Sequence, residues 1–255
     1  MPTLHARTEI LLGQAALKRL RHAHILIAGI GGVGGYVAEN LARAGIGALT
    51  LLDKDIVSSS NLNRQIMALR STLGKKKTTV MKARIIDIDP TIKINVIDDF
   101  MAVEDADRMV LSGDYDVIAD CIDTIACKAQ LVYAAQKHHI PIISAMGAGN
   151  RVDATRVRVS RLDKTQSCPL AREMRRRLRE LGADLKYPVV YTDEPRRQPF
   201  VENIGSDGYR EKVTNGTISY MPAIFGLLMA GEIVNWIIKD ELNIKQFDTD
   251  CFTRS

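Results

Sequence analysis

Short apolar runs alternate with longer segments of mixed polarity through the first 150 residues of the chain. Runs rich in isoleucine, leucine and valine are typical of strands buried on both faces of a parallel sheet. Strands are predicted at residues 25–28, 49–52, 92–97, 117–119 and 140–144, and helices at 34–44, 76–88, 105–111 and 127–138. An amphipathic helix is predicted at residues 7–21, with Ile10, Leu11, Leu17 and Leu20 on one side. This alternation predicts an α/β fold: an open, largely parallel Rossmann-like sheet with helices on both faces.

The pattern is less regular after Gly149. A strand is predicted at residues 156–160 and a strongly basic helix at residues 172–181. Prolines at positions 188, 195 and 199 indicate a loop or irregular structure across residues 187–200.

A last helix is predicted to begin near Ser219, with Pro222 in its first turn, where a missing N–H group costs nothing. Its apolar stretch, residues 221–238, carries Glu232 and Asn235 and is short of a membrane span. We therefore expect a buried helix and no membrane insertion.

The composition is that of an ordinary globular protein, with 46% hydrophobic and 25% charged residues. The net charge of +5 is compatible with a polyanionic partner but does not require one. Four scattered cysteines, Cys121, Cys127, Cys168 and Cys251, form no C-x-x-C pair, which argues against a zinc site and a disulfide framework. The N-terminus has no apolar signal core. We expect a cytoplasmic protein without zinc.

A glycine-rich loop follows the first predicted strand, with Gly29, Gly31, Gly32 and Gly34. Such glycines permit a tight turn and a close approach of the backbone to phosphates, and the next helix offers free N–H groups to the anion. Asp53, at the end of the second strand, is placed to bond ribose hydroxyls. These features fit NAD as well as ATP, so on their own they leave a redox or non-enzymatic nucleotide binder open.

A polar run after the second strand discriminates between these nucleotides. It contains Asn61, Asn63, Arg64 and Gln65, and the triple lysine Lys75, Lys76 and Lys77 follows. Cations at this place neutralise charge on a departing pyrophosphate when the α–β phosphate bond of ATP is broken. The alternative for at least two of these three lysines is a position on a solvated helix face. The run favours an ATP-consuming enzyme that activates a carboxylate.

Asp123 lies just beyond the fourth predicted strand. Its carboxylate is placed to hold Mg²⁺, directly or through water. The other interpretation is a helix cap before Thr124, because aspartate is a favoured N-cap residue.

Taken together, residues 7–149 resemble the ThiF, MoeB and E1-like adenylating superfamily. The matching motifs are Gly29-x-Gly31-Gly32-x-Gly34, Asp53-x-Asp55, Asn61-x-Asn63-Arg64-Gln65, Gly74-x-x-Lys77 and Asp120-x-x-Asp123. The resemblance implies an ATP-binding domain over residues 1–150 and a homodimer.

The same resemblance assigns roles to individual residues. It implies that Asp53 binds the ribose, that Arg64 and Lys77 contact the phosphates, and that Asp123 places the metal. It also implies that Arg7 reaches the ATP of the other protomer, with an exposed helix charge as the alternative. The ATP-binding residues it implies are Gly29, Gly31, Gly32, Gly34, Asp53, Asp55, Asn61, Asn63, Arg64, Gln65, Lys77 and Asp123, and the catalytic ones are Arg7, Arg64, Lys77 and Asp123.

The second half is similar to a narrower branch, the tRNA threonylcarbamoyladenosine dehydratases (TcdA, also called CsdL). The matching stretches are residues 144–149, 163–165, 169–172 and 216–222. This similarity implies that residues 151–255 form a substrate- and tRNA-facing extension packed on the same domain. It also implies the reaction: ATP activates the threonine carboxylate of N6-threonylcarbamoyladenosine (t6A) in tRNA as an acyl-adenylate, and the tethered carbamoyl group closes a ring to give cyclic t6A.

One alternative function stays open: adenylation of the C-terminus of a ubiquitin-like sulfur-carrier protein. Superfamily members with that activity usually carry two zinc-binding C-x-x-C pairs, which this chain lacks. Cys168 lies roughly where some relatives carry a thioester or persulfide cysteine, so a relay role and a sulfur-transfer partner are candidates. Cys121 is expected to pack in the core.

A basic run in the second half is predicted to contact the tRNA backbone. The expected contacts are Lys164, Arg172, Arg175, Arg176 and Arg179, with Arg161, Arg177, Arg196 and Arg197 adding to the same surface. A solvated helix face is the alternative, but few paired acids are expected near the run.

Overall fold

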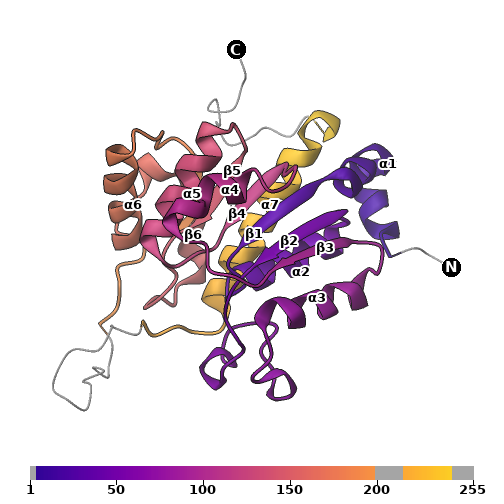
Figure 1. Ribbon diagram of the computed structural model, residues 1–255, viewed down its shortest axis with the longest axis horizontal. Coiled ribbons are helices and arrows are strands. Elements are labelled where there is room, and N and C mark those ends of the chain that lie inside the picture. The colour runs from indigo at the N-terminus through magenta and orange to yellow at the C-terminus, as the bar shows by residue number, and fades with distance from the viewer. Residues whose placement is uncertain (1–3, 199–214, 243–255) are drawn as a thin grey trace.

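Seven strands form one sheet in the computed structural model of the protein, which describes residues 4–198 and 215–242 (Figure 1). The strands are β1 (His24–Ala28), β2 (Ala48–Leu52), β3 (Lys93–Ile97), β4 (Val117–Asp120), β5 (Ile142–Ala145), β6 (Val157–Arg161) and β7 (Pro188–Thr192). Their order is β3-β2-β1-β4-β5-β7-β6, and each neighbouring pair is parallel except β7 and β6. The predicted open, largely parallel sheet is confirmed.

Helices cover both faces of this sheet (Figure 1). They are α1 (Ala6–His22), α2 (Gly34–Ala44), α3 (Lys77–Ile88), α4 (Ala106–Val110), α5 (Ile125–Lys137), α6 (Pro169–Glu180) and α7 (Tyr220–Leu242). Short 3₁₀ turns are η1 (Ser59–Asn61), η2 (Arg70–Thr72), η3 (Val103–Asp105), η4 (Ala154–Arg156) and η5 (Leu162–Lys164).

The alternation of side chains along the strands produces two separate cores. In β1, Ile25 and Ile27 pack in the core beneath α1, α2, α3 and α7, whereas Leu26 and Ala28 pack in the core beneath α4, α5 and α6. All four side chains are fully buried. This explains why the central strands read as continuous apolar runs rather than as alternating ones.

The prediction of irregular structure across residues 187–200 is wrong for its first part. Residues Pro188–Thr192 form β7, which pairs with β5 on one side and β6 on the other, and all five residues are buried. Pro188 stands at the first position of the strand, a place that tolerates a residue without an N–H group. Residues 199–214 lie outside the described part of the chain.

Helix α1 is amphipathic only in its second half. Leu17 and Leu20 are buried as expected, but Ile10 and Leu11 are 86% and 78% exposed. Gly13, with φ +80°, interrupts the helix between the two pairs. Because the interruption breaks the helical periodicity, the expected single apolar side does not form.

Helix α7 begins at Tyr220, close to the predicted start, and Pro222 lies in its first turn. Its residues Tyr220–Glu241 are long and apolar enough to cross a membrane by length and composition alone, so the expectation that this stretch is too short is wrong. Half of its most apolar 18-residue window is buried, and Met221, Phe225, Met229 and Ile233 are fully covered in the core. Such contacts are those of a core helix.

Candidate active site

A cavity of about 830 Å³ opens at the carboxyl ends of β1, β2, β4 and β5. The strand order reverses between β1 and β4, and open α/β sheets bind ligands at such a point. The cavity wall contains ten of the residues predicted to bind ATP: Gly29, Gly31, Gly32, Asp53, Asp55, Asn61, Arg64, Gln65, Lys77 and Asp123. Thus the structure brings the separate sequence motifs to one place, which supports a nucleotide site.

Two glycines shape the loop between β1 and α2. Gly29 has φ +93°, in the left-handed region that favours glycine. A methyl group on Gly34 would lie 1.8 Å from the carbonyl oxygen of Gly29, so the start of α2 passes directly against the turn. Gly34 is therefore a packing residue that lies outside the cavity wall.

We expect Gly34→Ala to destabilise the protein by about 1–3 kcal/mol and to weaken ATP binding, because the methyl group can be accommodated only by a shift of the loop backbone. Urea unfolding and titration with ATP measure the two effects. Gly231→Ala in α7 is the matched control, since a methyl group there meets nothing within 4 Å. That control is expected to be neutral or to stabilise by up to about 1 kcal/mol. Equal stabilities of the two variants would contradict the packing role.

Asp53 connects the end of β2 to the glycine loop. Its Oδ2 accepts a 2.7 Å hydrogen bond from the Ile30 N–H, and its Oδ1 accepts one of 2.8 Å from the Asp55 N–H. Each carboxylate oxygen retains a further lone pair. The side chain is thus fixed in orientation and keeps acceptor capacity toward the cavity that it lines.

Lys77 is the member of the triple lysine that lies in the cavity wall. An isolated antiparallel bridge between Ile56 and Lys76 brings the start of α3 beside the end of β2. The Lys77 side chain is 6% exposed, and its Nζ lies 2.7 Å from Oδ2 of the exposed Asp55. Lys76 instead pairs with Asp98 at 3.1 Å, outside the cavity. The choice of Lys77, which only its spacing from Gly74 favoured, thus has a geometric basis.

The polar run at residues 61–65 is held by local hydrogen bonds. Asn61 is buried and its Oδ1 accepts a 3.1 Å bond from the Ser58 N–H. Nη1 of Arg64 donates to the Ser60 carbonyl at 2.8 Å and to Oδ1 of Asn63 at 2.9 Å. The Arg64 guanidinium lines the cavity without a carboxylate partner among the residues described. Its charge is available to an anionic ligand.

Asn63 is not among the residues that line the cavity, and its side chain contacts another segment of the chain. Its Nδ2 donates a 2.9 Å hydrogen bond to the carbonyl of Thr217, which precedes α7 and itself lines the cavity. The predicted ATP contact of Asn63 stays a prediction, and the structure adds a link between the polar run and the last part of the chain.

Asp123 does not cap α5. The helix is preceded by Thr124, the Asp123 carboxylate receives only a 3.4 Å contact from the Thr124 hydroxyl, and its side chain is exposed in the cavity wall. Across residues 4–198 and 215–242 no three acidic, histidine or cysteine side chains gather into a metal site of their own. A single carboxylate in the cavity wall is compatible with Mg²⁺, which proteins often hold through one or two carboxylates together with the phosphates of a substrate.

A buried ion pair beneath this loop was not anticipated as part of the site. Nζ of Lys128 lies 2.9 Å from Oδ2 of Asp120, and both side chains are fully buried. The same Nζ donates to the carbonyl of Ile122 at 3.2 Å, and Ser144 Oγ donates to Asp120 Oδ2 at 2.6 Å. The network ties the end of β4 to α5 and β5 and so positions the segment that carries Asp123. Asp120 belongs to the motif Asp120-x-x-Asp123, so the sequence points to its importance. Lys128 lies within a predicted helix and belongs to no motif, so the sequence does not single it out.

The other end of the cavity is built from residues after β5. It includes Gly147, Arg151 and Cys168, with Arg196 and Asn215. Cys168 is 4% exposed and directly precedes α6. Burial and position do not test a relay role, which stays a prediction. Burial raises the pKa of the Cys121 thiol, in agreement with a packing role for that residue.

The basic helix α6 has more acidic partners than expected. Arg176 pairs with Glu173 and Glu180, and Arg177 pairs with Glu173 at 3.0 Å. Nη1 of Arg175 donates to the carbonyls of Leu162 and Thr165 at 3.2 and 3.1 Å, so that side chain holds η5 against α6. The premise of few paired acids is wrong. The predicted RNA contacts of this helix stay predictions, carried best by its exposed Arg172 and Arg179 and by nearby Lys164.

Arg7 is exposed on α1 and lies outside the cavity wall. A single chain therefore does not bring it to the site, and its predicted role requires a second protomer.

Residues 5–252 match the ThiF family. A tRNA threonylcarbamoyladenosine dehydratase of Bacillus subtilis is 35% identical over 241 residues, which cover 92% of this chain and 94% of the relative. The structure superposes on that of the Escherichia coli enzyme TcdA in complex with AMP, with a TM-score of 0.83, 34% identity and coverage of 92% and 93% of the two chains. The complex of the same enzyme with ATP gives a TM-score of 0.83 and 32% identity, with coverage of 96% and 100%. The chain belongs to the ThiF family.

Proposed function

We propose that the protein uses ATP to convert t6A in tRNA into cyclic t6A. The observation that carries this proposal is one continuous cavity with the glycine loop, Arg64 and Lys77 at one end and the wall built after β5 at the other. The full-length similarity to proteins named tRNA threonylcarbamoyladenosine dehydratase supports the substrate, and their complexes with AMP and ATP support the nucleotide. The same similarities make NAD the weaker candidate for the nucleotide and a sulfur-carrier protein the weaker candidate for the substrate.

The chemistry begins with a poor electrophile, the carboxylate of the threonine moiety. One of its oxygens attacks the α-phosphorus of ATP, the bond between the α-phosphorus and the bridging oxygen breaks, and pyrophosphate leaves. Asp53 holds the ribose, and Lys77 and Arg64 neutralise charge on the departing pyrophosphate. The tethered carbamoyl group then attacks the acyl carbonyl and AMP leaves. Substrate and leaving group are already in place, so proximity lowers the barrier and no protein nucleophile is needed.

Mg²⁺ bound at Asp123 would neutralise phosphate charge and hold the α-phosphate for attack. The Asp123 side chain is free for this task because it neither caps α5 nor pairs with a cation in the described chain.

A homodimer completes the proposed site. Arg7 lies on α1 beside Ile10 and Leu11, which are exposed to an extent unusual for large apolar side chains. Such a surface suits burial against a second copy, and Arg7 would then reach the partner's ATP. The tRNA would lie along exposed Lys164, Arg172 and Arg179, where phosphate contacts make binding dependent on salt. Because tRNA is its proposed substrate, we propose that the enzyme is cytoplasmic.

Mass spectrometry of nucleosides tests the proposal. We expect t6A-bearing tRNA incubated with the protein and ATP–Mg²⁺ to yield a nucleoside lighter by one water, and Asp123→Ala to yield little of it. Conversion by the unchanged protein supports the proposal. Unchanged t6A, with ATP–pyrophosphate exchange that depends on a protein ending in Gly-Gly, would replace it by the sulfur-carrier function.

A further inference from the structure

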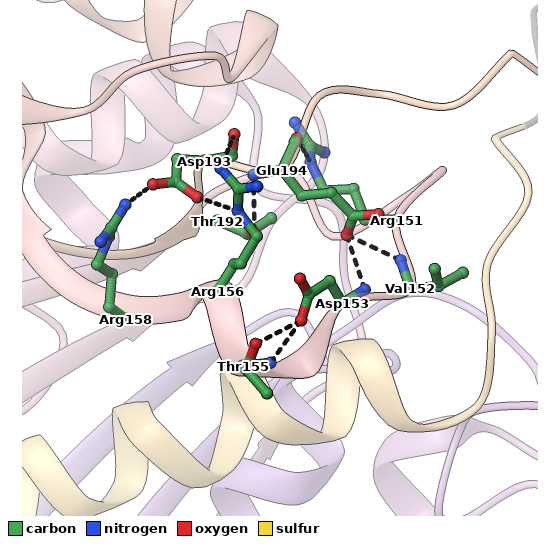
Figure 2. A network of polar contacts seen from close by, with 9 residues as sticks. All are labelled: Arg151, Val152, Asp153, Thr155, Arg156, Arg158, Thr192, Asp193 and Glu194. Atoms are coloured by element: carbon green, nitrogen blue, oxygen red, sulfur yellow. Dashed lines mark hydrogen bonds and ion pairs between the residues drawn. The ribbon is translucent and has the colours of Figure 1, made fainter.

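A buried arginine forms part of the cavity wall at the end remote from the glycine loop. Arg151 is 2% exposed and lies in the turn between β5 and β6. Figure 2 shows it beside Glu194, which follows β7. A guanidinium is always charged, and burying it is costly unless it finds compensating partners.

The hydrogen bonds of Arg151 go to neutral carbonyls. Nη1 donates to the carbonyls of Gly147 and Gly149 at 2.7 and 3.1 Å, and Nε donates to the carbonyl of Glu194 at 3.0 Å. These bonds use three of the five N–H donors of the group. The other two belong to Nη2, which is buried and has no hydrogen-bond partner among the residues described.

The carboxylate of Glu194 makes its hydrogen bonds elsewhere. Its Oε2 accepts bonds from the N–H groups of Val152 and Asp153 at 2.9 and 2.8 Å (Figure 2). Its Oε1 lies 3.3 Å from Nε of Arg197. Burial alone would raise the pKa of Glu194, but the Asp153 and Val152 N–H groups lower it. Its ionised group is thus committed to the backbone turn, which it holds in shape around Arg151.

A second guanidinium reinforces the positive charge. Arg196 lines the same cavity and is held by a hydrogen bond to Oδ1 of Asn215. The N–H of Arg197 donates to the Asn150 carbonyl at 2.9 Å, which fixes this segment over the turn. Burial is the main cause of a lowered pKa of Arg151; the nearby charge of Arg196 also lowers it, whereas the Cys168 thiol and the Glu194 carboxylate raise it. Because Glu194 is engaged by the backbone N–H groups and Arg197, two guanidinium groups in one cavity wall can attract a further anion.

We propose that Arg151, through Nη2 and assisted by Arg196, is the carboxylate-recognition residue for the acyl group that the protein adenylates. This inference rests on the proposed function. The phosphate end of the cavity already contains Lys77 and Arg64, whereas Arg151 lies at the other end. Nη2 is covered, so the proposed contact requires the cavity wall to move. Cys168 belongs to this wall: a methyl group on Gly147 would lie 3.4 Å from Nη1 of Arg151 and 3.7 Å from Cys168 Sγ.

The donor count suits the reaction. A single free terminal amino group holds one carboxylate oxygen and leaves the other free to attack the α-phosphorus. The oxygen held by Arg151 becomes the acyl carbonyl oxygen of the adenylate, so the contact persists while the ring closes. A bidentate clamp would occupy both oxygens and hinder the first step.

A binding experiment with paired ligands tests the inference. An anticodon stem-loop RNA bearing t6A is compared with the same RNA whose threonine carboxylate is a methyl ester, in the presence of a nonhydrolysable ATP analogue. We expect the unchanged protein to bind the acid roughly 10- to 100-fold more tightly than the ester, as fits one charged hydrogen bond. Arg151→Gln should abolish this preference while its affinity for the ATP analogue stays unchanged.

Arg158→Gln is the matched control, because Arg158 is an exposed arginine of β6 that pairs with Asp193 and lies outside the cavity wall (Figure 2). It should keep the preference. A preference retained in Arg151→Gln would overturn the inference, as would a loss of affinity for the ATP analogue alone, which would assign Arg151 to a phosphate. The intact ATP affinity also shows that the variant is folded. Conversion of t6A by the unchanged protein is measured separately, so failure of the proposed function is distinguished from failure of this inference.

Discussion

Lys77→Met is expected to lower the rate of cyclic t6A formation by about 10²- to 10³-fold, the effect of removing one preorganised electrostatic contact to a developing charge. Lys77 is buried in the cavity wall, and its Nζ lies 2.7 Å from Oδ2 of Asp55. In the proposed mechanism its charge faces the departing pyrophosphate. Methionine keeps most of the volume and removes the charge. The change should therefore appear in kcat more than in the free energy of unfolding. Nucleoside analysis and ATP–pyrophosphate exchange both measure it.

Lys76→Met supplies the control for this variant. Lys76 precedes Lys77 directly, but it is half exposed, pairs with Asp98 and lies outside the cavity wall. Hydrogen bonding from Thr78 is the main reason for the lowered pKa of Asp98, so that carboxylate does not depend on Lys76 alone. We expect near-normal rates for Lys76→Met. If both variants lost the same activity, a general effect of positive charge on tRNA binding would replace the specific role of Lys77.

Lys128→Met is expected to destabilise the protein by about 3–5 kcal/mol, because it leaves the Asp120 carboxylate buried without its counter-charge. Both side chains are fully buried, and their atoms approach to 2.9 Å. The carbonyl of Ile122 also loses a donor. Urea unfolding monitored by circular dichroism gives the free energy, and the midpoint should fall without a change in slope.

Lys137→Met provides the comparison on the same helix. Lys137 pairs with Asp107 at 3.1 Å, but half of its side chain is exposed. Exposed pairs contribute only about 0–1 kcal/mol. A cost for Lys128→Met no larger than that for Lys137→Met would mean that the buried pair is not needed for stability.

The sequence predicts the parts of this protein that depend on local pattern. The strands around β1 are runs buried on both faces, and the glycine loop needs left-handed backbone at Gly29, so both are readable from neighbouring residues. The sequence does not predict β7 because Pro188 and the prolines that follow at 195 and 199 suggest a turn, while the strand character of residues 188–192 comes from pairing with β5 and β6. The expected common side of Ile10, Leu11, Leu17 and Leu20 is wrong because the helix is interrupted at Gly13, and the apolar periodicity alone does not reveal this interruption.

The candidate site shows the same division. Motifs within the glycine loop and the polar run are contiguous, and the cavity contains most of them. The environments of Arg151 and Lys128 cannot be read from the sequence, because they depend on groups from other parts of the fold. Arg151 donates to carbonyls of its own turn, at Gly147 and Gly149, and to the carbonyl of Glu194, which two strands and a helix separate from that turn. Only the folded chain shows that Nη2 of Arg151 is buried without a hydrogen-bond partner within residues 4–198 and 215–242.

The link between the polar run and the last helix has a consequence for biosynthesis. Thr217 accepts the hydrogen bond of Asn63, and a methyl group on Gly32 would lie 3.1 Å from Cβ of Pro222. The glycine loop is synthesised well before residues 217–222, which pack against it. A nascent chain that lacks α7 also leaves the apolar surface of α2 uncovered. We therefore expect nucleotide binding to await the synthesis of α7, and a nascent chain that stops short of this helix to be prone to aggregation.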